Sequence, residues 1–171
     1  MPNYGDPKYW DKRYTENAGS IFDWLEDYNS LKPLLSELLT RDSRVLVLGC
    51  GNAKFSEDLY DDGYKNIYNI DISSVVIQTM SERNRSRPDM KYEVMDVCDI
   101  KYPTGFFDIA IDKSTLDALL CGDNAYINVA KMMKEVQRVL KPSGYYVAIS
   151  YGKPDSRAFH FEREHLSLTM K

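Results

Sequence analysis

The sequence predicts an α/β fold, in which helices cover a mostly parallel sheet as a Rossmann-like three-layer sandwich. Strand-like and helix-like stretches alternate through the middle of the chain, which is typical of a parallel sheet. The first strand-like run, Arg44–Leu48, is short, apolar and β-branched, and it ends at a glycine, which indicates a buried strand. The chain has 171 residues, which suits one domain with a single core.

The remaining elements are predicted from the spacing of apolar residues and from residues that cap helices or form turns. We expect a helix over 53–62 and a second strand over 66–70, after which Ser73 and Ser74 offer an N-cap for a helix that runs to about Arg85. Further along, the expected elements are strands over 91–94, 107–111 and 145–150, a helix over 126–140 with apolar residues at helical spacing, and a turn over 141–144.

We expect one domain over the whole chain, built from three parts. Residues 1–43 form helices laid before the sheet, including a helical stretch over 31–39. Residues 44–151 form the Rossmann-like core, and 152–171 form a short polar C-terminal extension. A helix over about 156–166 is the only element expected in this extension.

Composition and charge restrict the class of function. The formal charge of −4 argues against broad binding to nucleic-acid phosphates, which requires a basic face, and it is compatible with a basic protein substrate. No apolar run approaches the roughly 20 residues of a membrane helix, and the polar N-terminus does not resemble a secretory signal. The three cysteines contain no C-x-x-C pair, so we expect no disulfide framework and no metal site. These features predict a cytoplasmic protein.

A glycine loop marks the candidate binding site. Gly49 and Gly51, followed by Asn52, come directly after the first strand and before a helix. Ligands of open parallel sheets bind outside the carboxyl ends of the strands, where glycines let the backbone approach a ligand closely. Asp71 ends the second strand 20 residues after Gly51, where an acidic side chain can accept hydrogen bonds from both hydroxyls of a ribose.

The loop favours S-adenosylmethionine over a dinucleotide. A dinucleotide fingerprint has a third glycine or alanine three residues after the second, so that the helix N-terminus reaches the pyrophosphate. Lys54 occupies that position here. S-adenosylmethionine carries no phosphate, so the missing glycine removes little from its site.

Two further segments lie where the rest of the cofactor and the acceptor would be. After the third strand, Asp96 and Val97 can bond an adenine edge, although Asp96 can equally cap a loop. After the fourth strand come Asp112, Lys113 and Asp117, the usual place for groups that face the transferred methyl. Either aspartate could hold an incoming lysine ammonium, and either could instead form a salt bridge with Lys113 or cap a helix.

The first part of the chain is rich in aromatic residues, and two interpretations stay open. They pack the N-terminal helix onto the sheet, or they form a lid over the cofactor with aromatic faces near its sulfonium. The residues are Tyr9, Trp10, Tyr14, Phe22, Trp24 and Tyr28.

The combined motifs resemble one eukaryotic branch of class I methyltransferases. This branch includes the enzymes that methylate lysines of translation elongation factor 1-alpha and the methyltransferase associated with endothelin-converting enzyme. The strings Tyr9-Trp-Asp-Lys-Arg-Tyr14 and Asp112-Lys-Ser-Thr-Leu-Asp117 are fairly specific to the branch, and the likeness extends from about Tyr4 to Gly152.

The resemblance implies lysine methylation by S-adenosylmethionine, with elongation factor 1-alpha as the protein substrate. We also expect the chain to be a monomer or weak dimer. Asp112, Lys113 and Asp117 are then the candidate catalytic residues. The cofactor-binding residues that it implies are Trp10, Tyr14 and Trp24 over the cofactor, Gly49, Gly51 and Asn52 in the loop, Asp71 and Ile72 at the ribose, Asp96 and Val97 at the adenine, and Lys113 at the edge of the site.

One feature departs from the branch. Its members usually finish with an antiparallel strand hairpin, whereas only about 20 residues follow the fifth strand here and they do not alternate like a strand pair. That hairpin also walls the substrate pocket, so two alternatives remain open. The chain could methylate a small molecule, or it could be a cofactor-binding interaction module with weak catalysis.

Overall fold

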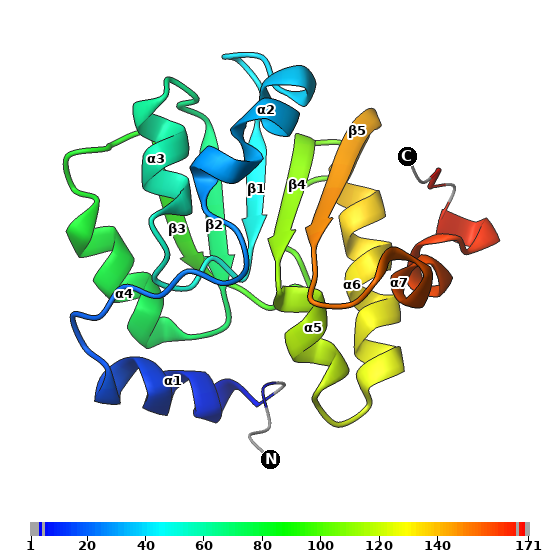
Figure 1. Cartoon of the computed structure of the whole chain (residues 1–171), viewed down its shortest axis with the longest axis horizontal. Coiled ribbons are helices and arrows are strands. Elements are labelled where there is room, and N and C mark those ends of the chain that lie inside the picture. Colours follow the sequence, from blue (N-terminus) through cyan, green and yellow to red (C-terminus); the bar gives the residue numbers. More distant parts are fainter. Residues whose placement is uncertain (1–3, 5, 167, 170–171) are drawn as a thin grey trace.

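A computed structural model describes residues 4, 6–166 and 168–169 (Figure 1). Five parallel strands form one sheet in the order β3-β2-β1-β4-β5. The strands are β1 (Val45–Leu48), β2 (Ile67–Asp71), β3 (Lys91–Val94), β4 (Phe107–Lys113) and β5 (Leu140–Ile149). The predicted α/β class and Rossmann-like sandwich are confirmed. The chain adds strands on one side of β1 and then on the other, which leaves a crevice between the ends of β1 and β4.

The helices connect and cover these strands. They are α1 (Pro7–Glu16), α2 (Tyr28–Leu38), α3 (Phe55–Asp61), α4 (Ser74–Arg83), α5 (Thr115–Leu120), α6 (Ala125–Val139) and α7 (Pro154–Phe161), followed by the 3₁₀ turn η1 (Glu164–Leu166). The predicted helix over 156–166 therefore divides into α7 and η1. Within the described residues no strand follows β5, and no helix is long and apolar enough to cross a membrane.

The first strand is buried on both faces, as its apolar run predicts. Leu46 and Leu48 pack with α6 on one side of the sheet, in a cluster that includes Met132 and Met133. Val45 and Val47 pack with α2 and α3 on the other side. The sheet is thus fixed between two apolar layers, and its strand ends provide a rigid base for a site.

Short helix α5 was not expected, because no local signal marks its start. Its N-cap residue Ser114 has a left-handed backbone (φ +68°) and makes no side-chain cap bond. The cap comes from Asp112 on β4, whose carboxylate accepts from the backbone N–H groups of Thr115 at 2.7 Å and Leu116 at 3.1 Å. This helix depends on a carboxylate that the sheet holds in place, so helical periodicity alone could not reveal it.

The last strand begins earlier than predicted. Phe107 pairs with Leu140 and Ile109 pairs with Tyr145, so the expected turn at 141–144 is present as an irregularity inside β5. Beyond it, β5 stays in register with β4 as far as the pair Lys113 and Ile149. The long strand brings its carboxyl end beside the start of α5.

Candidate active site

A cavity of about 400 Å³ lies at the carboxyl ends of the strands, in the crevice beside β1 and β4. Its volume falls in the range of small-molecule sites, which is roughly 300–1,000 Å³. The predicted site residues that line it are Trp10, Tyr14, Trp24, Gly49, Gly51, Asn52, Asp71, Ile72, Asp96, Val97, Lys113 and Asp117. Asp112 is the one predicted site residue that does not line this cavity.

The glycine loop requires its glycines. Gly49 and Gly51 have left-handed backbones, with φ of +60° and +54°. A Cβ atom at Gly49 would lie 2.2 Å from Oγ1 of Thr115, and one at Gly51 would lie 3.0 Å from Oη of Tyr14. The loop therefore turns sharply, and it is packed too closely for larger residues.

Asp71 is fixed by the same loop. Its carboxylate accepts from the N–H of Gly51 at 3.0 Å and from the N–H of Ser73 at 2.9 Å, and the side chain is buried at the cavity wall. Burial raises the pKa of this carboxyl to about 6, while the two N–H donors counteract part of the shift. The group is therefore mostly ionised at neutral pH and remains able to accept hydrogen bonds from a ligand.

In the segment after β3 the structure shows the capping role of Asp96, and its adenine-binding role stays a prediction. Oδ1 of Asp96 accepts from the backbone N–H of Cys98 at 2.8 Å, so this aspartate caps the turn and also lines the cavity. Val97 is buried in the apolar core. On the neighbouring strand end, Ile72 is 36% exposed and presents an apolar surface to the cavity.

Most of the N-terminal aromatic residues gather at the cavity rather than in the core. Trp10 stacks on Tyr14 with 5.9 Å between ring centroids, and Phe22 meets Trp24 edge to face at 4.8 Å. The Arg13 guanidinium lies 5.3 Å from the Phe22 ring and 5.8 Å from the Trp10 ring, so it contacts both pairs. Tyr28 packs in the core against Phe55, and Tyr14 also packs against the buried residues of α4.

Lys113 faces the segment that carries Trp24. Its ammonium donates to the carbonyl oxygens of Trp24 and Glu26, both at 2.9 Å, and forms an ion pair with Asp23. Only 9% of the Lys113 side chain is exposed. Burial lowers the pKa of this ammonium to about 8, so the charged form predominates at pH 7.

The two candidate aspartates have different surroundings. Asp112 is almost fully buried, and besides capping α5 it accepts from the Tyr146 hydroxyl at 2.7 Å. Asp117 lies on the cavity wall, where it accepts from Ser150 Oγ at 2.6 Å and from Arg157 at 2.7 Å. Of the two carboxylates, Asp117 lines the cavity and Asp112 does not.

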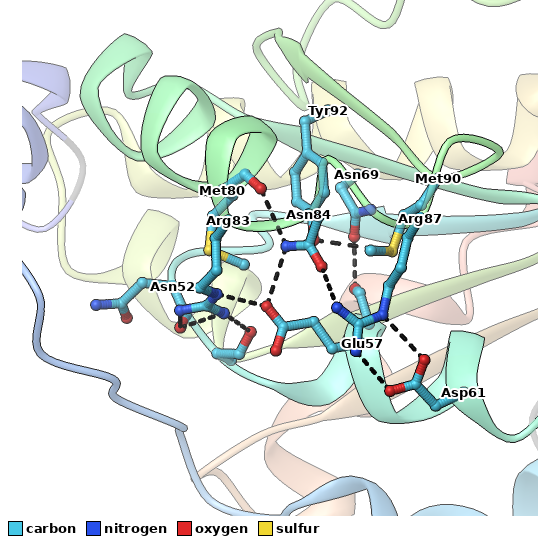
Figure 2. A network of polar contacts seen from close by, with 12 residues as sticks. Asn52, Glu57, Asp61, Asn69, Met80, Arg83, Asn84, Arg87, Met90 and Tyr92 are labelled. Carbon is cyan, nitrogen blue, oxygen red and sulfur yellow. Dashed lines mark hydrogen bonds and ion pairs between the residues drawn. The ribbon is translucent and has the colours of Figure 1, made fainter.

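A polar network behind the glycine loop was not foreseen (Figure 2). Arg83 on α4 donates to the carbonyl oxygens of Asn52 at 3.1 Å and Ala53 at 3.1 Å, and it forms a salt bridge with Glu57 on α3. Asn84 donates to the same Glu57 carboxylate at 3.0 Å. The network fixes the loop between two helices, and its members are too far apart in sequence to form a motif.

Sequence reasoning also missed three further residues of the cavity lining. Tyr151 and Arg157 line the cavity beyond the end of β5, and Asp23 lines it from the segment before α2. The position of Asp23 between Phe22 and Trp24 was a usable signal. The other two lie in a polar stretch with no pattern, so only the fold brings them to the site.

The observed residues fit S-adenosylmethionine. The loop leaves no room for a side chain at Gly49 and little at Gly51, a buried carboxylate lies beside it, and aromatic rings flank the cavity. Such a donor set suits a ribose and a sulfonium, because a carboxylate accepts hydroxyl hydrogens and aromatic faces attract cations. The single lysine on the cavity wall is already held by protein groups.

Comparison with known proteins agrees with this class of site. A family model described as a methyltransferase domain matches residues 46–148. The chain therefore belongs to the methyltransferase domain family.

Two curated mouse proteins show where in this family the chain falls. The chain is 33% identical over 177 residues to the EEF1A lysine methyltransferase 4 of Mus musculus, covering 98% of this chain and 69% of that protein. It is 40% identical over 167 residues to the eEF1A lysine and N-terminal methyltransferase of Mus musculus, covering 94% of this chain. The chain spans only 24% of the latter protein's length.

Solved structures share the fold. A SAM-dependent methyltransferase of Methanosarcina mazei superposes with a TM-score of 0.59 at 25% identity, covering 75% of this chain and 61% of that one. The geranyl diphosphate C-methyltransferase of Streptomyces coelicolor, solved with S-adenosyl-L-homocysteine, gives a TM-score of 0.64 at 15% identity over 94% of this chain and 73% of that one. The second similarity concerns the fold alone.

Proposed function

We propose that this chain transfers a methyl group from S-adenosylmethionine to a lysine side chain of a protein, with elongation factor 1-alpha as the substrate. The observation that carries the proposal is the buried Asp71 carboxylate held beside Gly51 at the cavity wall. The names of the relatives, which describe lysine methylation of elongation factor 1-alpha, support the choice of substrate. We place this activity in the cytoplasm, in a monomer or weak dimer.

The protein groups divide into cofactor-binding and acceptor-facing sets. We assign Asp71 and Ile72 to the ribose, Asp96 and Val97 to the adenine, and the remaining binding residues to the methionine end and the lid. These remaining residues are Trp10, Tyr14, Trp24, Gly49, Gly51 and Asn52. When bound, the cofactor supplies an electrophilic methyl group on a sulfonium.

The chain's contribution to the reaction is mainly to position and desolvate the acceptor amine. A lysine amine attacks only in its neutral form, and its ordinary pKa is about 10.4, so an apolar surrounding that disfavours the ammonium promotes the reaction. Trp24, Leu25 and Leu119 supply apolar walls on the acceptor side. Asp117 is the acidic group that we assign to the incoming ammonium, and orientation accounts for much of the remaining barrier.

The mouth of the cavity favours a protein acceptor over a small molecule. Tyr151 is 87% exposed and Leu25 is 45% exposed, although both belong to the cavity lining. Exposed apolar side chains at a rim suit contact with a second protein surface, whereas a small acceptor would be enclosed. We assign Asp112 to holding α5 and leave it out of the acceptor contacts.

The proposal is tested by calorimetric titration with S-adenosylmethionine, followed by a methylation assay on purified elongation factor 1-alpha. We expect micromolar binding that Asp71→Ala abolishes, and methylation of a lysine that is lost when that lysine is replaced by arginine. Binding without turnover on any lysine-containing translation factor would instead identify an interaction module. Transfer to a small acceptor alone would identify a small-molecule enzyme, and absence of binding would overturn the cofactor site.

A further inference from the structure

The segment between α1 and α2 crosses the carboxyl ends of the strands (Figure 1). We call residues 20–26 the strap. Four of its residues line the cavity: Phe22, Asp23, Trp24 and Leu25. The strap contains no helix or strand, and Phe22 and Leu25 are each 45% exposed. Its position over the cavity therefore depends on side-chain contacts, namely those of Arg13 with the Phe22 and Trp24 rings and a few polar contacts at the two ends of the strap.

One end of the strap is attached to the glycine loop. Nδ2 of Asn52 donates to the carbonyl oxygen of Ser20 at 2.7 Å, and Oδ1 of Asn52 accepts from the backbone N–H of Phe22 at 3.3 Å. One side chain thus satisfies both a donor and an acceptor of the strap backbone. Because Asn52 also lines the cavity, the strap and the cofactor loop share a wall.

The other end is attached to β4 through Lys113. The ammonium makes three contacts with the strap. It donates to the Trp24 and Glu26 carbonyl oxygens and forms an ion pair with the Asp23 carboxylate. The same ammonium lies 5.7 Å from the Phe55 ring beneath it. Within the described part of the chain, the ammonium therefore makes its polar contacts with the strap alone.

The strap backbone is bent to suit this cation. Leu25 has a left-handed backbone with φ of +63°, which L-residues other than glycine and asparagine rarely adopt. The carbonyl groups on either side of it, those of Trp24 and Glu26, both meet the Lys113 ammonium. The turn is closed by the Glu26 N–H, which donates to the Trp24 carbonyl oxygen at 2.9 Å, and the charged hydrogen bonds from Lys113 hold the same carbonyl group and that of Glu26 in place.

We propose that Lys113 and Asn52 are positioning residues that fasten the strap over the cofactor cavity, and that Lys113 takes no part in methyl transfer. This inference rests on the proposed function only in naming S-adenosylmethionine as the molecule beneath the strap. Lys113 holds Trp24 on the cavity wall, so it controls how fast the cofactor enters and leaves. It replaces the catalytic role that the sequence motif suggested for this lysine.

The first test removes the cation while keeping the strand. Lys113→Met retains the apolar stem in β4, and hydrogen exchange is measured on the unliganded protein. We expect faster exchange in peptides covering residues 20–27, with peptides from β1 and α6 unchanged. In the same variant, S-adenosylhomocysteine should dissociate at least about tenfold faster, because losing a single charged hydrogen bond would have about this effect and the variant loses all three contacts of Lys113 with the strap. The kcat at saturating cofactor should change much less than the KM for the cofactor.

A matched pair at Leu25 tests the strap without altering Lys113. Leu25→Gly accepts positive φ freely, so it should disturb strap exchange and S-adenosylhomocysteine dissociation much less than Leu25→Pro does, although it removes an apolar side chain from the cavity lining. Leu25→Pro fixes φ near −65° and should reproduce the Lys113→Met effects. In a double variant, Leu25→Pro should add little to the exchange and dissociation rates of Lys113→Met, because both changes release the same attachment of the strap. Asn52→Ala should loosen residues 20–22 more than residues 23–26.

The outcomes distinguish a failure of the fastening role of Lys113 from a failure of the proposed function. Unchanged exchange in the strap of Lys113→Met together with a lost kcat would overturn the proposal and return this lysine to the chemistry. Equal effects of Leu25→Gly and Leu25→Pro would overturn it as well. If the wild-type chain binds no S-adenosylhomocysteine while Lys113→Met still loosens the strap, the proposed function fails and the fastening role stands.

Discussion

The network behind the glycine loop gives a prediction whose size follows from the structure (Figure 2). Arg83 makes three hydrogen bonds of 3.1–3.2 Å to loop carbonyl oxygens, and its Glu57 partner has a side chain that is only 10% exposed. In Arg83→Met the Glu57 carboxylate keeps only its bond from Asn84. Breaking a buried ion pair from one side costs about 3–5 kcal/mol. The arginine is 26% exposed, so we expect a loss of about 2–4 kcal/mol in the free energy of unfolding.

Arg87 provides a matched control four residues further along. It pairs with Asp61 through two hydrogen bonds and donates to Asn84 at 3.1 Å, and its own side chain is 22% exposed. The Asp61 side chain is 56% exposed, so its carboxylate can be hydrated when the arginine is removed, and Arg87→Met should cost about 1 kcal/mol, less than Arg83→Met. Urea unfolding followed by circular dichroism measures both variants, with an unchanged slope showing that the folded and unfolded states are comparable.

A third variant tests the cause of the loss. Glu57→Gln in the Arg83→Met background removes the unpaired charge, and it should restore about 1–2 kcal/mol. The reasoning is refuted if Arg83→Met and Arg87→Met cost the same, or if the added Glu57→Gln lowers stability further. Either result would mean that the unpaired buried charge of Glu57 is not the cause of the stability loss in Arg83→Met.

Three further predictions concern the cavity. S-adenosylmethionine should bind about tenfold more weakly at pH 5 than at pH 7.5, because ligand hydroxyls require the ionised carboxylate and burial raises the pKa of Asp71 to about 6. Calorimetry on Asp71→Asn should show no such dependence, and a matching slope in that variant would exclude this carboxyl as the cause. Gly49→Ala should lower stability more than Gly105→Ala, since both have positive φ but only the first places a Cβ 2.2 Å from Oγ1 of Thr115. The expected difference in urea unfolding is about 1 kcal/mol or more, and equal losses would contradict the packing argument. Asp117→Ala should speed hydrogen exchange over residues 150–157, because its carboxylate accepts from Ser150, Tyr151 and Arg157. Unchanged exchange there would show that other contacts hold this segment.

Much of the fold could be predicted from local pattern. The buried run before Gly49 sets β1, and the strands and helices up to β3 lie within a few residues of their expected bounds. Ser73 caps α4 through its hydroxyl, as its position implies. The assignment of the chain to a helical lid over 1–43, a core over 44–151 and an extension over 152–171 stays a prediction.

The candidate site divides in the same way. Gly49, Gly51 and Asp71 were found because the turn between a strand and a helix requires special residues at fixed spacing, and such spacing is visible in sequence. The choice between Asp112 and Asp117 was not visible, because both follow β4 and either could face the acceptor. Burial decides it: one carboxylate caps α5 inside the protein, and the other lies on the cavity wall.

The sequence by itself determined the order of the elements, the glycine loop and the acid after β2, because each depends on neighbours within a few residues or on a fixed register between adjacent strands. Only the tertiary structure decided what Lys113, Arg83 and Arg157 do. Their partners lie 89, 31 and 40 residues away. Contacts at such separations form only after the sheet and its helices have packed, so no local pattern records them.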